Sequence, residues 1–272
     1  MTTTLIRPPS GWSSIGLREL AEYRELLYFL TKRELQVRYK QSVFGVSWAV
    51  LQPVLLAFIF TIFFGVLADI PSEGLPYPVF AMAALVPWIF VSQTVSQSAL
   101  SLIGDANLLS KVYFPRLVIP LAKALALLVD LAIALVVVVV IALLYSHPPG
   151  AEVLVLPPFL LLALVTGVGL GILLAAVNVK YRDVSLAVPL LMQVWLFATP
   201  VIYPGSLVAG GWKYVYAVNP MVSVVEGARW ALLDAPVPEL LPVLISVAVA
   251  LALLVAGVVY FKRTELFFAD VV

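Results

Sequence analysis

The sequence predicts an all-α integral membrane protein with six transmembrane helices, and three observations lead to that prediction. Of the 272 residues, 63% are hydrophobic and only 11% are charged, whereas a soluble domain is about half apolar and a quarter charged. Apolar runs long enough to cross about 30 Å of hydrocarbon recur along the chain, and in lipid such runs form helices. Basic residues gather at every second connection. The runs cover residues 44–68, 79–103, 117–146, 153–178, 184–204 and 240–261.

The distribution of Lys and Arg predicts that both termini are cytoplasmic. Fourteen of the 16 basic residues lie in the N-terminal segment, in or beside the second-to-third and fourth-to-fifth connections, and in the tail. Only Lys213 and Arg229 fall on the other side. Basic connections stay in the cytoplasm. No cleavable signal peptide is expected, because the first 43 residues are charged throughout.

Three regions follow from this pattern. Residues 1–43 form a cytoplasmic N-terminal segment, residues 44–261 the six-span transmembrane domain, and residues 262–272 a cytoplasmic tail. Within 17–40, apolar residues at helical spacing alternate with charged ones, which predicts an amphipathic helix on the membrane surface. Residues 203–239 are rich in aromatic residues, Gly and Pro but too apolar for an ordinary loop, so re-entrant helices are expected between spans five and six.

The composition argues against several kinds of site. The chain has no cysteine and a single histidine, His147, so neither a thiolate nor a histidine metal site is expected. It also lacks a GxxxxGK[ST] motif and therefore a P-loop for ATP. A glycine pattern at 167–171 lies inside the fourth span, where small residues favour close helix packing over nucleotide binding.

The second span carries a polar stripe. Gln93, Gln97 and Ser101 recur at every fourth residue and so share one helix face, whereas Leu102 is expected to face lipid. A polar stripe in a span avoids lipid. Two interpretations stand: the wall of a hydrated conduit for a hydroxyl-rich substrate, or hydrogen bonding between helices.

Aromatic residues cluster near the ends of the spans. An interfacial belt is the simplest explanation for any one of them. The alternative is a surface on which the C–H faces of sugar rings stack. The aromatic residues assigned to a substrate channel on this reasoning are Tyr39, Trp48, Trp88 and Trp195.

Two pairs of charged residues are assigned structural roles. Asp130 lies near the middle of the third span, where an isolated carboxylate is costly. Lys123 is two helical turns away on roughly the same face, so an ion pair between them is expected in preference to a proton relay. Glu226 and Arg229, in the external stretch, are spaced for a local ion pair.

The basic connection at 105–116 is either an ordinary loop or a docking element. Asp105-Ala-Asn107 offers a helix N-cap, and the following short helix would expose apolar groups that a cytoplasmic partner could cover. The residues assigned to such coupling are Asn107, Leu108, Leu109, Lys111, Val112, Tyr113 and Arg116.

The order of motifs resembles one family along essentially the whole chain. KRELQVRYKQSVFGVSWAVLQP at 32–53, NLLSKVYFPR at 107–116, NVKYRDV at 178–184, TPVIYP at 199–204 and Asn219-Pro220 resemble the membrane subunit of bacterial type-2 ABC exporters for polysaccharides and polyol phosphates, O-antigen export permeases among them.

The resemblance implies a homodimer in the bacterial inner membrane with two separate ATPase subunits. ATP and Mg would be bound by those subunits, and this chain would hold no cofactor. The 105–116 loop would be the coupling helix. The expected function is ATP-driven export of a lipid-linked polysaccharide through a channel at the dimer interface, among membrane lipids and without nucleic acid.

Other functions remain open at this point. Within transporters, the alternatives are export of teichoic acid or of a small lipophilic drug. From other classes, the chain could be a membrane-embedded enzyme or a scaffold. An enzyme would need convergent titratable residues at one depth, and Asp130 is the only good intramembrane candidate. A scaffold would not need the polar stripe.

Overall fold

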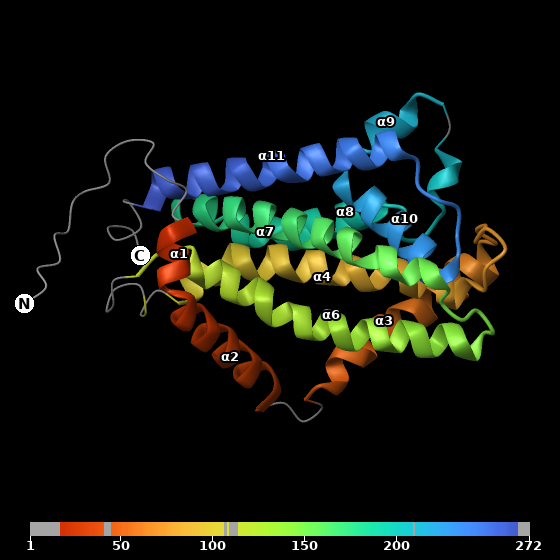
Figure 1. Cartoon of the computed structure of the whole chain (residues 1–272), viewed down its shortest axis with the longest axis horizontal. Coiled ribbons are helices and arrows are strands. Elements are labelled where there is room, and N and C mark those ends of the chain that lie inside the picture. The colour runs from red at the N-terminus through yellow and green to blue at the C-terminus, as the bar shows by residue number, and fades with distance from the viewer. Residues whose placement is uncertain (1–16, 41–44, 106–107, 109–113, 209, 266–272) are drawn as a thin grey trace, which may run out of the picture.

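The computed structural model describes residues 17–40, 45–105, 108, 114–208 and 210–265, and all regular structure within them is helical. The long helices run side by side in one bundle (Figure 1). Five helical segments are long and apolar enough to cross a membrane, judged by length and composition. They are Ser47–Leu67, Tyr77–Gly104, Val118–Leu144, Ala151–Lys180 and Leu240–Thr264.

These five segments match five of the six predicted runs. The first consists of α3 and a π-helical continuation, η1, and the fourth of a 3₁₀ turn, η2, followed by α7. Their elements are α3 (Ser47–Phe60), η1 (Thr61–Leu67), α4 (Tyr77–Gly104), α6 (Val118–Leu144), η2 (Ala151–Val155), α7 (Leu156–Lys180) and α11 (Leu240–Thr264).

The remaining run gives a shorter helix. α8 covers Val184–Phe197, which is 14 residues. At 1.5 Å per residue it is about 21 Å long, less than the roughly 30 Å hydrocarbon core. Thr199 and Pro200 follow it in a turn. The sixth crossing therefore stays a prediction.

α4 is the central helix of the bundle. It packs against α3, α6, α7, α8 and α10 and is the most buried of the five candidate spans, whereas the first and last spans are the least buried. The polar stripe of the sequence thus lies on the innermost helix. Leu102 is completely buried, so the expectation that it faces lipid is wrong: its side chain packs in an apolar cluster with Phe114 and Phe261.

α7 and α11 approach each other closely at two glycines. A Cβ atom on Gly169 would lie 2.7 Å from the backbone nitrogen of Leu254, and one on Gly257 would lie 2.4 Å from the carbonyl oxygen of Gly169. No side chain fits in either place. The glycine pattern at 167–171 therefore serves helix packing, as predicted.

Residues 17–40 are helical as predicted, but in two pieces, α1 (Leu17–Glu22) and α2 (Arg24–Lys40). α2 packs against α6 and slants away from the axis of the bundle (Figure 1). Its location on a membrane surface stays a prediction. The packing brings its C-terminal charged residues to the middle of α6.

Residues 203–239 contain η3 (Gly205–Leu207), α9 (Trp212–Tyr216) and α10 (Pro220–Leu233). α10 begins at Asn219, whose side chain accepts a hydrogen bond from the Met221 amide at 3.0 Å, and Pro220 occupies the first turn, where its missing N–H costs nothing. The helix is almost wholly buried and packs against α4, α7 and α11. The burial of α10 agrees with a stretch that is too apolar for an ordinary loop. That it follows a re-entrant path stays a prediction.

Candidate functional site

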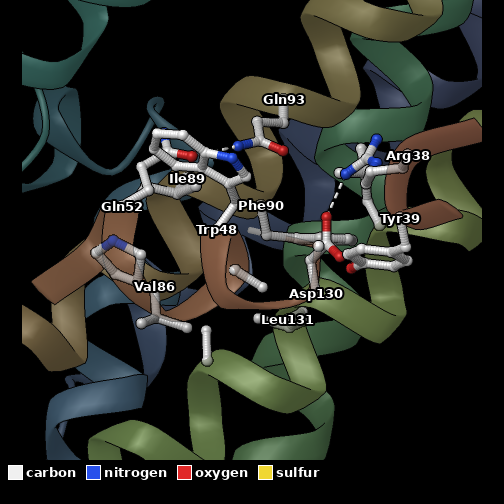
Figure 2. Close-up of a pocket in the computed structure, with 15 residues that line it drawn as sticks. Arg38, Tyr39, Trp48, Gln52, Val86, Ile89, Phe90, Gln93, Asp130 and Leu131 are labelled. Carbon is white, nitrogen blue, oxygen red and sulfur yellow. Dashed lines mark hydrogen bonds and ion pairs between the residues drawn. The ribbon is translucent and has the colours of Figure 1, made fainter. Parts of the chain in front are cut away.

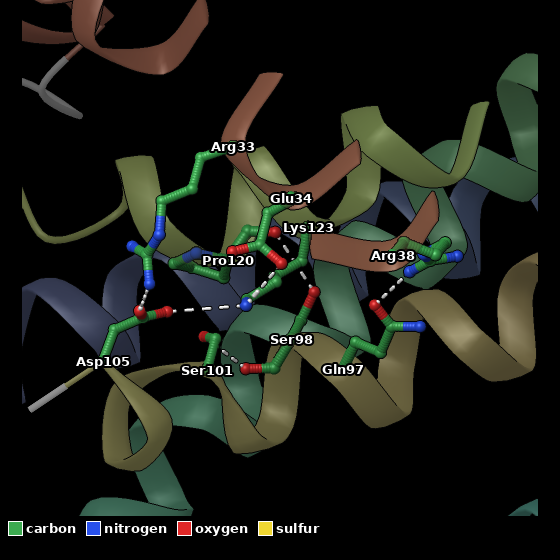
Figure 3. A network of polar contacts seen from close by, with 9 residues as sticks. All are labelled: Arg33, Glu34, Arg38, Gln97, Ser98, Ser101, Asp105, Pro120 and Lys123. Atoms are coloured by element: carbon green, nitrogen blue, oxygen red, sulfur yellow. Dashed lines mark hydrogen bonds and ion pairs between the residues drawn. The ribbon is translucent and has the colours of Figure 1, made fainter. Parts of the chain in front are cut away.

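A network of ion pairs joins α2 to the ends of α4 and α6 that adjoin the 105–116 loop (Figure 3). Lys123 Nζ lies 2.7 Å from Glu34 Oε2 and 3.5 Å from Asp105 Oδ2. Arg33 Nη2 donates to Asp105 Oδ1 at 3.0 Å. Asp105 is thus held from two helices, directly before the predicted coupling residues.

A further ion pair lies nearer the C-terminal end of α2. The guanidinium of Arg38 pairs with Asp130 and also donates through Nη2 to Gln97 Oε1 at 2.6 Å. The expected pair between Lys123 and Asp130 is therefore wrong. The two residues are about 10 Å apart along α6 at 1.5 Å per residue. Each pairs with a side chain of α2 instead, Lys123 with Glu34 and Asp130 with Arg38.

Between α2, α3, α4 and α6 the structure holds a cavity of about 110 Å³ (Figure 2). Arg38, Tyr39 and Asp130 line one end. At the other end Gln93 Nε2 donates to Gln52 Oε1 at 2.9 Å. The rest of the lining is mostly apolar: Gly45, Trp48, Ala49, Pro53, Val86, Ile89, Phe90, Leu127, Leu131 and Ala134.

The cavity collects three of the seven residues assigned to a substrate channel, Tyr39, Trp48 and Gln93. Trp48 stands at its edge with half of its surface exposed. Gln97 touches Arg38 instead. Ser101 is buried and donates to the Ser98 carbonyl at 2.7 Å. The stripe therefore serves two purposes, with Gln93 at the cavity and the other two residues in contacts within the bundle.

The two remaining aromatic residues lie elsewhere. Trp88 is buried and meets Trp195 edge to face, with ring centroids 5.4 Å apart. Trp195 Nε1 donates to Asn219 Oδ1 at 2.9 Å, and Asn219 Nδ2 donates to Thr199 Oγ1 at 2.9 Å. These side chains tie the end of α8 to the start of α10, which gives the Asn219-Pro220 motif a structural role.

Arg229 is buried, but its partners are not those expected. Its guanidinium donates to the carbonyl oxygens of Val201 at 2.9 Å and Tyr203 at 3.4 Å, and it lies 3.5 Å from the centre of the Phe80 ring. The contacts found within the described part of the chain go to backbone and ring, not to Glu226. The predicted local ion pair is wrong, because the guanidinium of Arg229 binds backbone carbonyls of the 199–204 turn instead.

Glu226 lines a second cavity, of about 340 Å³, at the end of the bundle that carries η3 and α9. Burial raises the pKa of Glu226 to about 7, with Arg229 opposing the shift and Glu73 and Glu239 adding to it. The cavity is also lined by Lys213, whose Nζ is 2.6 Å from Glu239 Oε2.

Most of the predicted coupling residues lie outside the described residues: Asn107, Leu109, Lys111, Val112 and Tyr113. Leu108 is half-buried against a second apolar cluster around Phe114 and Phe261. The amide of Arg116 donates to Glu265 Oε1 at 3.1 Å, and its guanidinium donates to the Glu265 carbonyl. The end of the loop at Arg116 therefore lies beside the end of α11.

Sequence reasoning missed Gln52 and the partners on α2. Gln52 follows Trp48 by one helical turn, a spacing that places both on one face, so a signal was available. Glu34 and Arg38 share the same spacing on α2. Among the described residues, no group of three or more His, Asp or Glu side chains is placed to hold a metal ion.

Comparison with known proteins gives this helical bundle its family. Residues 25–233 match the ABC-2 type transporter family, so the chain belongs to that family of membrane transport proteins. The chain is 32% identical over 257 residues to the O-antigen export system permease protein RfbA of Myxococcus xanthus, covering 93% of this chain and 98% of the relative.

More distant relatives carry related names. The chain is 26% identical over 249 residues to an O-antigen export system permease protein RfbA of Klebsiella pneumoniae, covering 91% of this chain and 95% of the relative. It is 26% identical over 213 residues to the polysialic acid transport protein KpsM of Escherichia coli, covering 76% and 81%.

Proposed function

We propose that this chain is the permease subunit of an ATP-driven exporter that moves a lipid-linked polysaccharide across the bacterial inner membrane. The observation that carries the proposal is the likeness to O-antigen export permeases over nearly the whole length of both chains. The polysaccharide names of the relatives agree across two kinds of glycan, O-antigen and polysialic acid.

The energy source is a separate protein in this proposal. Two ABC ATPase subunits bind ATP and Mg and dock on the 105–116 loop. Contacts at both ends of the loop support that role. It begins at Asp105, which pairs with Arg33 and Lys123, and it ends at Arg116, whose amide donates to Glu265. A force applied to the loop would reach α2, α6 and α11 directly.

The path for the glycan lies between two copies of the chain. Spans that face lipid on all sides do not carry exposed amides, yet Gln52 on α3 and Gln193 on α8 are exposed in otherwise apolar helices. A second copy would cover these faces and share a polar conduit. The six-span topology, the cytoplasmic termini and the re-entrant α9–α10 region belong to the same proposal.

Transport by the reconstituted complex tests this function. The chain and its cognate ABC ATPase would be incorporated into liposomes with a lipid-linked oligosaccharide, a lipid-linked polyol phosphate or a lipophilic dye on the ATP-accessible side. We expect ATP-dependent transfer of the oligosaccharide, scored by a glycosidase that reaches only the far side. Transfer of the dye or the polyol phosphate alone would replace this proposal with drug or teichoic-acid export.

A further inference from the structure

The second cavity has the size of a ligand pocket. It lies beside η3 and α9, and α9 is at the opposite end of the bundle from α1 (Figure 1). Its volume is about 340 Å³, within the range of about 300–1,000 Å³ of ligand pockets and above the roughly 150 Å³ that holds a benzene ring. One six-membered ring with its hydroxyl groups fits in this space. The charged residues that line it are Glu73, Lys213, Glu226, Arg229 and Glu239.

The carboxylate of Glu226 is the acceptor that the protein leaves without donors. Glu226 is partly buried, and burial and nearby charges, not hydrogen bonds, set its pKa. The side-chain atoms of the described chain that are both unpartnered and fully enclosed belong to other residues, so the oxygens of Glu226 keep accessible surface at the cavity that they line. Because a partly desolvated acceptor gains by meeting a donor, this carboxylate is the point where a ligand would bind.

Gly205 lets this carboxylate lie against the backbone of η3. A Cβ atom on Gly205 would lie 1.7 Å from Glu226 Oε1, far inside any contact distance, so a side chain there would push the carboxylate aside. The next residue, Ser206, donates to Glu73 Oε1 at 2.6 Å and leaves the other oxygen of Glu73 for another donor. The segment at η3 thus positions two carboxylates at one cavity.

The two cations of the cavity already have partners. Lys213 Nζ donates to both carboxylate oxygens of Glu239, at 2.8 and 2.6 Å. The guanidinium of Arg229 donates to the carbonyl oxygens of Val201 and Tyr203. The groups left for a ligand are therefore mainly acceptors, and a ligand that fits them donates hydrogen bonds.

Charge narrows the ligand to a neutral one. A phosphate would bring acceptor oxygens and negative charge next to carboxylates, which offer no proton when ionised. A cation would lie beside Arg229 and Lys213, which repel it. A group of neutral hydroxyls donates to the carboxylates without either penalty. The cavity also offers apolar surface for the C–H groups of a ring, at Val222, Ala235, Pro236 and Pro242.

We infer that the second cavity binds one neutral, hydroxyl-rich sugar unit of the exported glycan through donation from its hydroxyls to Glu226. The inference rests on the proposed function and adds a site to it. In the proposed topology this end of the bundle faces the side to which the glycan is delivered. The site therefore holds a sugar unit after it has crossed the membrane.

Photolabelling tests the site directly. The complex with the ATPase, in nanodiscs that leave both faces open to solution, would be exposed to a β-glucoside that carries a diazirine in a short alkyl chain. The matched probe is the same molecule with every hydroxyl methylated, so that it has no donors. We expect the glucoside to label the peptide 210–239 at least about fivefold more than the methylated probe does, the effect of about one hydrogen bond. Excess methyl β-glucoside should compete, whereas inorganic phosphate and ethylammonium should not.

A matched pair of variants localises the contact. Glu226→Gln replaces the ionisable carboxylate by an amide and should lower labelling by roughly fivefold. Asp234→Asn makes the same change at an exposed residue that does not line the cavity and should leave labelling unchanged. Gly205→Ala keeps the carboxylate but displaces it, and should also lower labelling. The competition results on the unmodified protein do not depend on any variant folding.

Four results would overturn the inference. Equal labelling by the methylated probe would mean that the cavity does not recognise hydroxyls. Competition by phosphate would make it an anion site, and competition by ethylammonium a cation site. Undiminished labelling of Glu226→Gln would remove the carboxylate from the contact. ATP-driven glycan export by the same complexes separates the two proposals, because its absence in the wild type sinks the proposed function, whereas export without specific labelling sinks only this site.

Discussion

Arg38, near the end of α2, pairs with Asp130 in the middle of α6, across 92 positions of sequence. The pair attaches the N-terminal helix to the bundle at the depth where the cavity lies. It also explains how a carboxylate is tolerated in an apolar helix, since a charge in a span needs a partner. The N-terminal helix is thus part of the transport domain and not a separate appendage.

Breaking that pair should destabilise the fold. Asp130→Leu leaves the guanidinium of Arg38 without its carboxylate. Because the pair is only partly buried, the loss should be smaller than the about 3–5 kcal/mol that breaking a fully buried pair costs. Arg38→Met combined with Asp130→Leu should recover most of the loss. Thermal unfolding of the detergent-purified protein measures this, and equal melting temperatures for the single and double variants would show that the pair contributes nothing.

Cysteine labelling should distinguish the cavity from the buried part of the stripe. The chain has no native cysteine, so single cysteines report one position each. Gln52→Cys and Gln93→Cys should react with a membrane-impermeant thiol reagent, and Ser101→Cys, at 3% exposure, should not. Leu100→Cys, on the exposed face of α4, is the control for a lipid-facing position. Reaction at 101 with protection at 93 would reverse the assignment.

The contact between α7 and α11 should not tolerate a side chain at Gly169. Gly169→Val places new atoms against the backbone of Leu254, and overpacking of this kind costs about 1–3 kcal/mol. Gly104→Ala is the control, because a Cβ atom there meets no atom within 4 Å. A melting temperature for Gly169→Val as high as that of the control would mean that the two helices separate freely.

Stability around the second cavity should depend on pH through Glu226. Its pKa is raised by burial from 4.5 to about 7, so the fold favours the protonated form. The group therefore disfavours folding increasingly as pH rises from about 4.5 to 7, and below that window the penalty is absent.

The melting temperature of Glu226→Gln should therefore depend less on pH than that of the wild type. The gain of the variant over the wild type should be larger at pH 8 than at pH 5. Glu25→Gln, at an exposed position on α2, provides the matched control. An unchanged difference between pH 5 and pH 8 in Glu226→Gln would assign the dependence to other groups.

Hydropathy was enough to predict five of the membrane helices, because a 20-residue apolar run in lipid has few alternatives to a helix. Hydropathy overestimated the length of the fifth helix. Residues 198–204 are apolar enough to extend it, but they form a turn region that contains Pro200 and Pro204. The helical character of residues 17–40 was predicted from the spacing of their apolar residues, and the break at Tyr23 was not.

The site was harder to predict because its contacts join distant segments. Lys123, Asp130 and Arg229 were recognised as charges that need partners, and each partner proved to be something other than the nearest charge in sequence. Arg33 and Asp105, for example, are 72 positions apart. Local spacing identifies which side chains face each other along one helix, but the packing of α2 on α6 decides which of them meet.

The central claim is that a separate ATPase drives glycan export by acting on the 105–116 loop. The most direct measurement is ATP-dependent transfer of a lipid-linked oligosaccharide in liposomes that hold the complex with either the wild-type chain or the double variant Leu109→Asp, Tyr113→Asp. We predict that the wild type transfers the glycan and that the double variant inserts normally but hydrolyses ATP without transfer. Undiminished transfer by the double variant would contradict the account.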